Sequence, residues 1–145
     1  MTSDFQALHD RLAIEDLMSR YSLAIDTGRH DDLDDVFTSD AHIDYTEMGG
    51  PAGTYPEIKQ WLASTLPMFT ALLHINANPL VSVTGDTATA RTICFTPMQF
   101  DSPDQKSRVL FCGLWYHDEF ARTDRGWRIT RRREEKCVDA TVAVT

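Results

Sequence analysis

The second half of the chain is a succession of strand-like segments separated by short turns, and this pattern limits the fold more than any other feature. The segments cover residues 71–83, 87–100, 108–121 and 127–137. Two of the connections are tight turns that contain Gly85 and Gly126, and the third is a polar loop over residues 101–106. Strands joined in this way pair as an antiparallel meander. Because long strands twist and coil, we expect a strongly curved sheet.

The first half of the chain carries helical patterns. Apolar residues recur every three or four positions over residues 5–25, which predicts an amphipathic helix that Gly28 terminates. A short helix is predicted over residues 31–37 and a short strand over residues 41–46. The run Thr54-Tyr55-Pro56-Glu57 is typical of a capping box and predicts a third helix. The face of the first helix that we expect to be buried comprises Leu8, Leu12, Leu17, Met18, Tyr21 and Ile25.

Together these patterns predict an α+β fold in which three N-terminal helices pack on one face of a strongly curved antiparallel sheet. The sheet would curl around the helices as a cone-shaped α+β barrel with one open mouth. At 145 residues, the chain is predicted to form a single domain over residues 1–145. A domain of this size buries enough surface for a core with a modest pocket.

Charge and cysteine content exclude several classes of partner. The formal net charge of −8 argues against nucleic acid, whose binding requires clustered Lys and Arg. The basic run Arg131-Arg132-Arg133 is followed at once by Glu134-Glu135, which is also typical of a solvated strand edge. Three cysteines without C-x-x-C spacing argue against a disulfide framework or a structural zinc site. No apolar run is long enough for a bilayer and no export signal is recognisable, so we expect a cytoplasmic protein that binds no membrane.

Asp26 and His74 are the leading candidates for a catalytic pair. Asp26 ends the first predicted helix, and His74 shares one face of a strand-like run with Leu72 and Asn76. A carboxylate that holds an imidazole in one tautomer is the usual way to make a general base at neutral pH. Taken alone, a histidine in a strand is more often a hydrogen-bonded core residue, and Asp26 is equally suited to capping the chain that enters the next helix.

Several short motifs, taken in order, resemble those of a known family. The motifs are Ile14-Glu15-Asp16-Leu17 with Tyr21 and Asp26, Ile43-Asp44-Tyr45, His74, and Gly126-Trp127-Arg128-Ile129. They resemble SnoaL-like members of the nuclear transport factor two-like superfamily, in the branch that contains scytalone dehydratase, bile-acid 7α-dehydratase and hexachlorocyclohexane dehydrochlorinase. The resemblance covers residues 7 to about 138 and implies the cone-shaped fold. It does not select one reaction, because the superfamily also contains isomerases, cyclases, oxygenase subunits and non-catalytic carriers.

The resemblance implies roles for individual residues. Asp26 and His74 match the dehydratase dyad, and Tyr21 matches a polar pocket residue. Tyr45 matches a tyrosine that serves the substrate carbonyl in scytalone dehydratase, and Arg132 matches an arginine of the dehydrochlorinase. Both tyrosines are equally suited to core roles with a satisfied hydroxyl. A slip of one residue in the last strand would turn one of the neighbouring arginines, 131 or 133, inward instead of Arg132.

The expected pocket is apolar. Where scytalone dehydratase has a second histidine with a nearby serine and asparagine, the resemblance places Met98, Leu110 and Cys112, which argues against scytalone as the substrate. Phenylalanine dominates the walls that we expect, which favours an apolar ligand. The residues predicted to line the substrate pocket are Phe69, Asn76, Phe95, Met98, Phe100 and Phe111.

These patterns favour a cofactor-independent lyase that acts on a small hydrophobic cyclic, polyketide-like or steroid-like molecule. His74 would take a proton from carbon while Arg132, with Tyr45 or Tyr21, meets the developing charge. An isomerase or cyclase with the same dyad, and a non-catalytic ligand-binding or oxygenase-small-subunit-like module, stay open as alternatives. We predict no metal and no organic cofactor, because the sequence offers neither a third ligand beside the pair His42 and Asp44 nor a phosphate-binding loop. Strands that are apolar on both faces predict a homo-oligomer, a dimer or a trimer.

Overall fold

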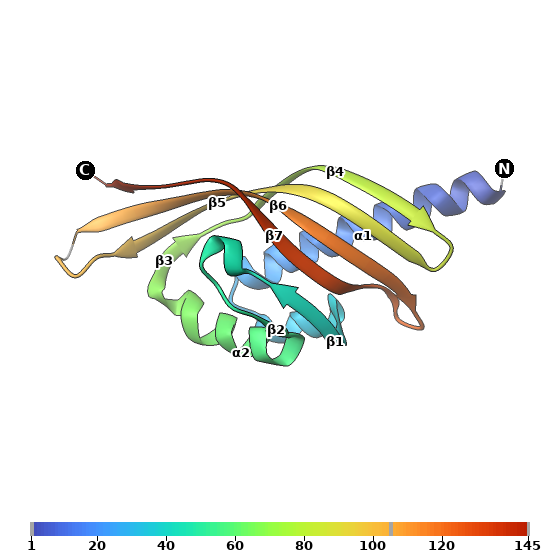
Figure 1. Ribbon diagram of the computed structural model, residues 1–145, viewed down its shortest axis with the longest axis horizontal. Coiled ribbons are helices and arrows are strands. Elements are labelled where there is room, and N and C mark those ends of the chain that lie inside the picture. The colour runs from blue at the N-terminus through green and yellow to red at the C-terminus, as the bar shows by residue number, and fades with distance from the viewer. Residues whose placement is uncertain (1, 105, 145) are drawn as a thin grey trace.

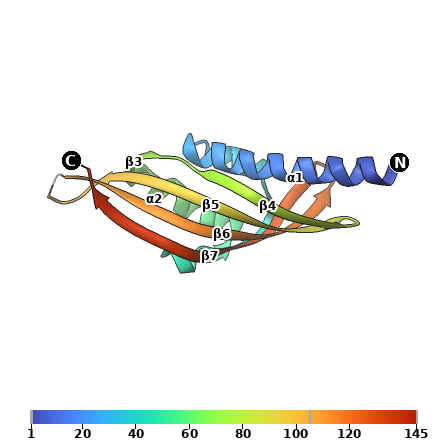
Figure 2. The same cartoon turned by 90° about the horizontal axis from the view of Figure 1, so that it is seen from above.

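The long first helix lies along one face of a curved sheet in the computed structural model. This helix, α1 (Thr2–Asp26), runs above the strands in Figure 2, and its N-terminal turns project past them at the right of Figure 1. The structure describes residues 2–104 and 106–144. The remaining elements are η1 (His30–Asp35), β1 (Phe37–Asp44), η2 (Thr46–Met48), β2 (Ala52–Thr54), α2 (Tyr55–Thr65), η3 (Leu66–Met68), β3 (Phe69–Leu72), β4 (Ile75–Thr84), β5 (Thr87–Asp101), β6 (Ser107–Thr123) and β7 (Gly126–Ala143).

The seven strands form one sheet in the order β2-β1-β7-β6-β5-β3, with β4 also paired to β5. Strands β4 to β7 are the predicted antiparallel meander, so the α+β class and the curved sheet are confirmed. One pairing differs from the expectation, because β1 runs parallel to β7. Parallel neighbours need a long crossover, and residues 45–125 separate these two strands. Shifts of register at residues 113–114 and 119–120 accompany the bending of the β6–β7 ladder.

The strand predicted over residues 71–83 is broken into two, and the break creates part of the candidate site. Both β3 and β4 pair with β5, and Leu73 and His74 lie between them. On the facing strand Pro97 has no N–H to donate to a ladder. The backbone N–H of His74 instead donates a hydrogen bond of 3.0 Å to the Asp26 carboxylate. A local defect in the pairing therefore places a histidine where a helix end can contact it.

Other boundaries follow local chemistry. The predicted helix over residues 31–37 is only a 3-10 turn, η1, and Phe37 already begins β1, which therefore starts before residue 41. The capping box is confirmed, since the Thr54 N–H donates to the Glu57 carboxylate at 2.8 Å and α2 begins directly after it. The C-terminal segment, which carries little sequence signal, extends β7 to residue 143 by pairing with the first half of β6.

The buried face of α1 is rotated from the predicted one in its first turns. Leu8 and Leu12 are more than half exposed. Asp10 is buried in their place and receives two hydrogen bonds of 2.8 Å from Arg122 and one of 3.2 Å from the Trp127 indole. A paired carboxylate therefore sets the orientation of these turns. Further along α1 the face expected from the sequence is buried, through Leu17, Met18, Tyr21 and Ile25, together with Ile14 and Ala24.

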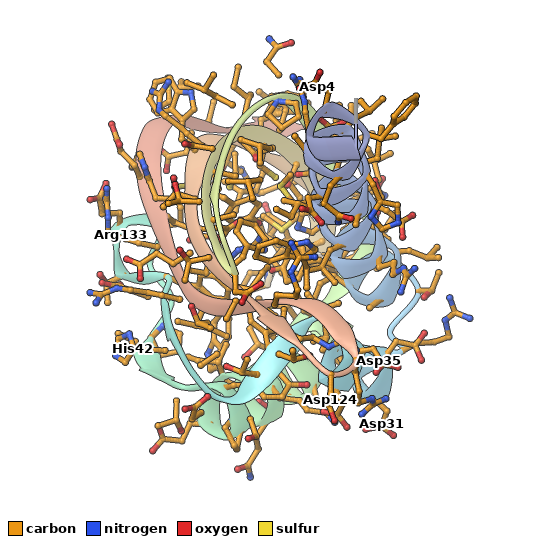
Figure 3. The ribbon with its side chains drawn as sticks, turned by 90° about the vertical axis from the view of Figure 1, so that its right-hand side faces the viewer. Asp4, Asp31, Asp35, His42, Asp124 and Arg133 are labelled. Atoms are coloured by element: carbon orange, nitrogen blue, oxygen red, sulfur yellow. The ribbon has the colours of Figure 1, made fainter. Side chains whose placement is uncertain are left out.

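Most charged side chains lie at the periphery, and apolar and aromatic groups form most of the interior, although a few charged side chains, among them Asp118 and Arg132, are buried. Figure 3 looks along the curl of the strands, with α1 closing one side, and shows Asp31, Asp35, Asp124 and Arg133 around the edge of the molecule. No helix within residues 2–104 and 106–144 combines the length and the apolar character needed to span a membrane.

Candidate active site

A cavity of about 200 Å³ lies between the concave face of the sheet and the C-terminal turns of α1 and α2. Gly49 and Gly50, which follow η2, form part of its wall. A Cβ atom at position 50 would lie 2.8 Å from the Cβ of Tyr45 and 3.2 Å from the Trp61 ring, so glycine allows the loop to pack this closely. Most of the wall is apolar, and its members include Ile25, Met48, Trp61, Leu62, Phe69 and Met98.

His74 lines this cavity and is held by Asp26 at two points. Its Nδ1 atom lies 2.6 Å from Asp26 Oδ1, and its backbone N–H donates to Oδ2 of the same carboxylate. The side chains of His74 and Asp26 are 9% and 22% exposed. Because Asp26 ends α1, the helix fixes both the ring and the backbone of His74. With Nδ1 directed at Asp26, Nε2 is the ring nitrogen left for a ligand.

Tyr21 and Tyr45 are also in the cavity wall, and they contact each other. Their hydroxyl oxygens lie 2.8 Å apart, and both side chains are buried. Burial raises the pKa of both phenols above the ordinary value, so both stay neutral hydrogen-bonding groups at physiological pH. The Tyr21 ring also packs edge-on to His74, with 6.1 Å between the ring centres. The two tyrosines thus bring a pair of hydroxyl groups together in the wall of the cavity that His74 also lines.

Arg132 points inward, but it lies behind the cavity wall. Its Nε and Nη2 atoms donate to the two Asp118 carboxylate oxygens at 2.7 and 2.8 Å. Its guanidinium lies over the rings of both Tyr21 and Tyr116, with Cζ 4.1 and 3.9 Å from their centres. The neighbouring Arg131 is exposed, so the register of β7 turns Arg132 into the core. Arg132 is therefore a group that contacts the cavity through tyrosine rings.

Glu134 is a cavity residue that sequence reasoning missed. It follows Arg132 by two positions on β7, so strand alternation turns both residues to the concave face. The residue is only 8% exposed and lines the same cavity as His74. Burial raises the pKa of its carboxyl to about 8, although the nearby Arg132 charge lowers it. The sequence signal was the two-residue spacing from Arg132, which the interpretation of a solvated charge run concealed.

The predicted pocket residues divide into two groups. Phe69 and Met98 line the cavity, and so do Leu110 and Cys112, the positions that the family resemblance had pointed out. The other four predicted residues are not in its wall. Those four are Asn76, Phe95, Phe100 and Phe111.

Parity along the strands explains most of that division. Thr96 and Met98 face the cavity, so Phe95 is on the opposite face of β5, where it stacks on Phe111 with 5.9 Å between ring centres. Phe100 is on the same face of β5 as Met98, but its ring packs edge-on against Phe69.

Asn76 faces α1 instead of the cavity. Its Nδ2 donates to Ser22 Oγ at 2.6 Å and to the Met18 carbonyl at 3.3 Å.

Within the part of the chain that the structure describes, no three His, Cys, Asp or Glu side chains are grouped as metal ligands. The candidate site therefore consists of one imidazole, one cavity carboxyl group, and phenols in an otherwise apolar wall.

Comparison with known proteins identifies relatives over most of the chain. The family model described as the SnoaL-like domain matches residues 6–133. An uncharacterized protein of Mycobacterium tuberculosis (strain H37Rv) is 55% identical over 130 residues, which covers 90% of this chain and 87% of that protein. An uncharacterized protein of Mycobacterium bovis has the same identity and coverage.

Solved structures share the fold at low sequence identity. A protein of Kribbella flavida has a TM-score of 0.85 and 23% identity, covering 92% of this chain and 95% of that one. A candidate scytalone dehydratase of Novosphingobium aromaticivorans has a TM-score of 0.81 and 22% identity, covering 100% and 94% of the two chains. A hexachlorocyclohexane dehydrochlorinase, LinA Type2, has a TM-score of 0.81 and 21% identity, covering 97% and 93%. At these identities the likeness establishes the fold alone.

Proposed function

This chain belongs to the SnoaL-like family, and on that premise we propose that it is a lyase that eliminates water or another leaving group from a small hydrophobic molecule. The observation that carries the proposal is the contact between His74 and Asp26 at the cavity wall. The names of a dehydrochlorinase and a candidate dehydratase of the same fold both denote eliminations, which supports the reaction class.

His74 is the proposed general base. Its Nδ1 faces a carboxylate that stabilises the protonated ring, so Nε2 can take a proton from a carbon atom of the substrate. Asp26 would then act as the orienting partner and would not touch the substrate. The hydrogen bond from the backbone N–H of His74 to the same carboxylate limits rotation of the two side chains. This restriction lowers the entropy cost of reaching a reactive geometry.

Tyr21 and Tyr45 are proposed as donors to the substrate oxygen on which negative charge develops. Removal of a proton next to a carbonyl leaves an enolate, and preorganised hydroxyl donors stabilise such an oxyanion. One of the two hydroxyl protons is used in the Tyr21–Tyr45 contact, which leaves the other for a ligand. Arg132 would be a positioning residue, because its charge lies against the Tyr21 ring and is neutralised by Asp118.

The cavity favours a compact apolar substrate. At about 200 Å³ it is smaller than the pockets that hold drug-sized ligands. The proposed substrate is therefore a cyclic molecule with few polar groups, and cyclic ketones that carry a leaving group in the β position are suitable probes. All proposed groups belong to the chain itself, so no cofactor enters the proposed step.

The test measures turnover of a panel of cyclic β-hydroxy and β-chloro ketones by mass spectrometry. We expect H74A and D26N to lose about 10²–10⁴-fold in turnover, the usual size of a general-base contribution. The matched control is H117A, because His117 makes an equally short contact of 2.6 Å to Glu135 away from the cavity wall. Retention of activity within a few-fold in H74A and D26N would end the proposal. A product of unchanged mass would mean isomerisation or cyclisation, and binding without turnover would mean a ligand-binding module.

We also propose that the chain forms a homo-oligomer through the convex face of the sheet. Large apolar side chains are exposed there, which is unusual for a monomer. Light scattering coupled to size-exclusion chromatography should show a dimer or trimer at micromolar concentration, and a monomer would contradict the proposal. The exposed residues that support it are Ile75, Leu80, Ile93 and Phe95.

A further inference from the structure

Glu134 places a second ionisable group in the cavity that His74 lines, and the dyad leaves it unused. It comes from β7, whereas His74 comes from the break between β3 and β4, so the two groups are held by separate parts of the sheet. Among residues 2–104 and 106–144, no side chain hydrogen-bonds to the Glu134 carboxyl or forms an ion pair with it. A carboxyl group that is 8% exposed and lacks a partner is costly for stability, which makes a functional role the better explanation.

The charge of Arg132 lowers the pKa of the Glu134 carboxyl, but the two side chains form no ion pair in the described part of the chain. Arg132 is two residues away on the same strand face, but its Nε and Nη2 atoms are occupied by Asp118. The charged groups nearby are mostly acidic, because Asp44 of β1 and Glu47 of η2 also act on Glu134. The other titratable groups whose charges interact with it are Tyr21, Tyr45, Cys94, Cys112 and Tyr116.

We propose that Glu134 is the general acid of the reaction, a neutral carboxylic acid that protonates a hydroxyl group as it leaves the substrate. This inference rests on the proposed lyase function and adds the leaving group to it. The substrate class becomes a β-hydroxy carbonyl compound, and the reaction becomes a dehydration.

The environment of Glu134 keeps the acid form available at neutral pH. Burial is the largest influence and raises the pKa of its carboxyl to about 8, while Arg132 lowers it and Asp44 and Glu47 raise it further. The nearby Cys112 thiol has its pKa raised to about 11, so its titration is separated from that of Glu134. The tyrosines that interact with Glu134 titrate above their ordinary values and stay neutral in the same range.

The proposed step conserves atoms and charge. His74 Nε2 takes the proton from the α-carbon, and the electron pair of that C–H bond forms the new carbon–carbon double bond. The β-carbon–oxygen bond breaks, and the departing oxygen takes the Glu134 proton and leaves as water. His74 is then an imidazolium and Glu134 a carboxylate, and transfer of one proton between them through solvent restores both groups.

A general acid discriminates between leaving groups. Hydroxide is a poor leaving group and needs a proton, whereas chloride leaves as a stable anion and needs none. An acid in the cavity is therefore useful for dehydration and has little effect on dehydrohalogenation. The proposal thus predicts that loss of Glu134 separates the two classes of probe.

The experiment compares wild type, E134Q and E135Q on a cyclic β-hydroxy ketone and on the β-chloro ketone with the same ring. Glutamine keeps the shape of the side chain but cannot transfer a proton. We expect E134Q to lose about 10²-fold or more in turnover of the hydroxy ketone and to stay within three-fold of wild type on the chloro ketone. E135Q, next along the strand and paired with His117, should match wild type on both.

The pH profile gives a second readout. Wild-type turnover of the hydroxy ketone should fall as the pH rises through about 8, because Glu134 loses its proton there. E134Q should lack this fall. Equal losses on both probes, or an unchanged alkaline limb in E134Q, would overturn the proposal.

A titration without substrate separates this inference from the proposed function. Carbon-13 NMR of the glutamate carboxyl groups, assigned to Glu134 by the signal that E134Q removes, should show a titration near pH 8. A Glu134 signal that titrates below pH 6 would overturn the role as an acid even if H74A abolishes turnover. A titration near pH 8 together with an inactive wild type on every probe would instead count against the lyase reaction.

Discussion

Two neighbouring cross-strand pairs of the β6–β7 ladder use buried charge in opposite ways. Asp118 faces Arg132 in one pair. Two residues along on the same face of the sheet, Tyr116 faces Glu134. Asp118 and Arg132 are almost inaccessible and are joined by two short hydrogen bonds, while Arg132 Nη1 has no hydrogen-bond partner among the described residues. Glu134 is nearly as buried but faces a phenol ring and a cavity. A carboxyl group on this sheet face therefore stabilises the fold or remains available for proton transfer, depending on whether a cation is present opposite it.

The free-energy balance explains the difference. Desolvation of both members of an ion pair costs several kcal/mol, and a bidentate contact recovers this only when both partners remain. Cation–π attraction to the rings of Tyr21 and Tyr116 further stabilises the buried Arg132 charge. Glu134 has no such compensation, so it avoids the cost by keeping its proton, which raises the pKa.

The largest effect is expected from breaking the ion pair between Asp118 and Arg132. D118A leaves the Arg132 charge buried without a counter-ion, and we expect the free energy of unfolding to fall by about 3–5 kcal/mol. Urea unfolding followed by circular dichroism measures this change. The matched control is E119A, because Glu119 is exposed on the opposite face of β6 beside Arg131 and should change stability by less than about 0.5 kcal/mol. Similar losses in the two variants would show that the buried pair has no special weight.

A smaller, pH-dependent effect is expected at Glu134, which faces Tyr116 in the other pair. The carboxyl of Glu134 has a pKa of about 8 in the folded chain against 4.5 ordinarily, so the folded state keeps a proton that the unfolded state releases. Stability should therefore fall as the pH rises from about 5 to 8, by on the order of 1–3 kcal/mol. E134Q has no proton to retain and should lose this part of the pH dependence. Parallel stability curves for E134Q and wild type would contradict the comparison.

The smallest effect is expected from the hydroxyl contact between the tyrosines that lie beside the two pairs. Y45F removes the 2.8 Å contact with Tyr21 and keeps the ring, and we expect a loss of about 1 kcal/mol in unfolding free energy. Thermal unfolding at constant pH measures it. A loss as large as that of D118A would mean that the tyrosines and the ion pair form one cooperative network.

Much of the fold was predictable because local signals agree with the global arrangement. The periodicity of the first helix, the capping box before α2 and the turns at Gly85 and Gly126 each predicted an element that the structure contains. The parallel pairing of β1 with β7 was not predictable, since no local signal encodes the partner of an eight-residue strand. The rotation of the first turns of α1 was missed for a similar reason, because it depends on Arg122, a residue more than a hundred positions away.

The candidate site was predictable where residue type and family resemblance agreed. His74 and Asp26 were singled out in this way, and the structure brings their side chains into contact. Phe95 was misplaced because it differs from Met98 by an odd number of positions on one strand, so the two cannot share a face of a regular strand. Glu134 was missed because a charge run in sequence is usually solvated, and only the curl of the sheet shows which of its members are buried.

The sequence by itself determined the class of fold, the position of its helices and long strands, and a pair of residues suited to proton transfer. The elements depend on periodicity and turn chemistry, which are local properties, and the pair was recognised from residue type together with the family resemblance. Only the tertiary structure decided that Arg132 is paired with Asp118 while Glu134 faces the cavity with no partner among the described residues. The protonation of a carboxyl group depends on burial and on the charges around it, and both exist only after distant strands have come together.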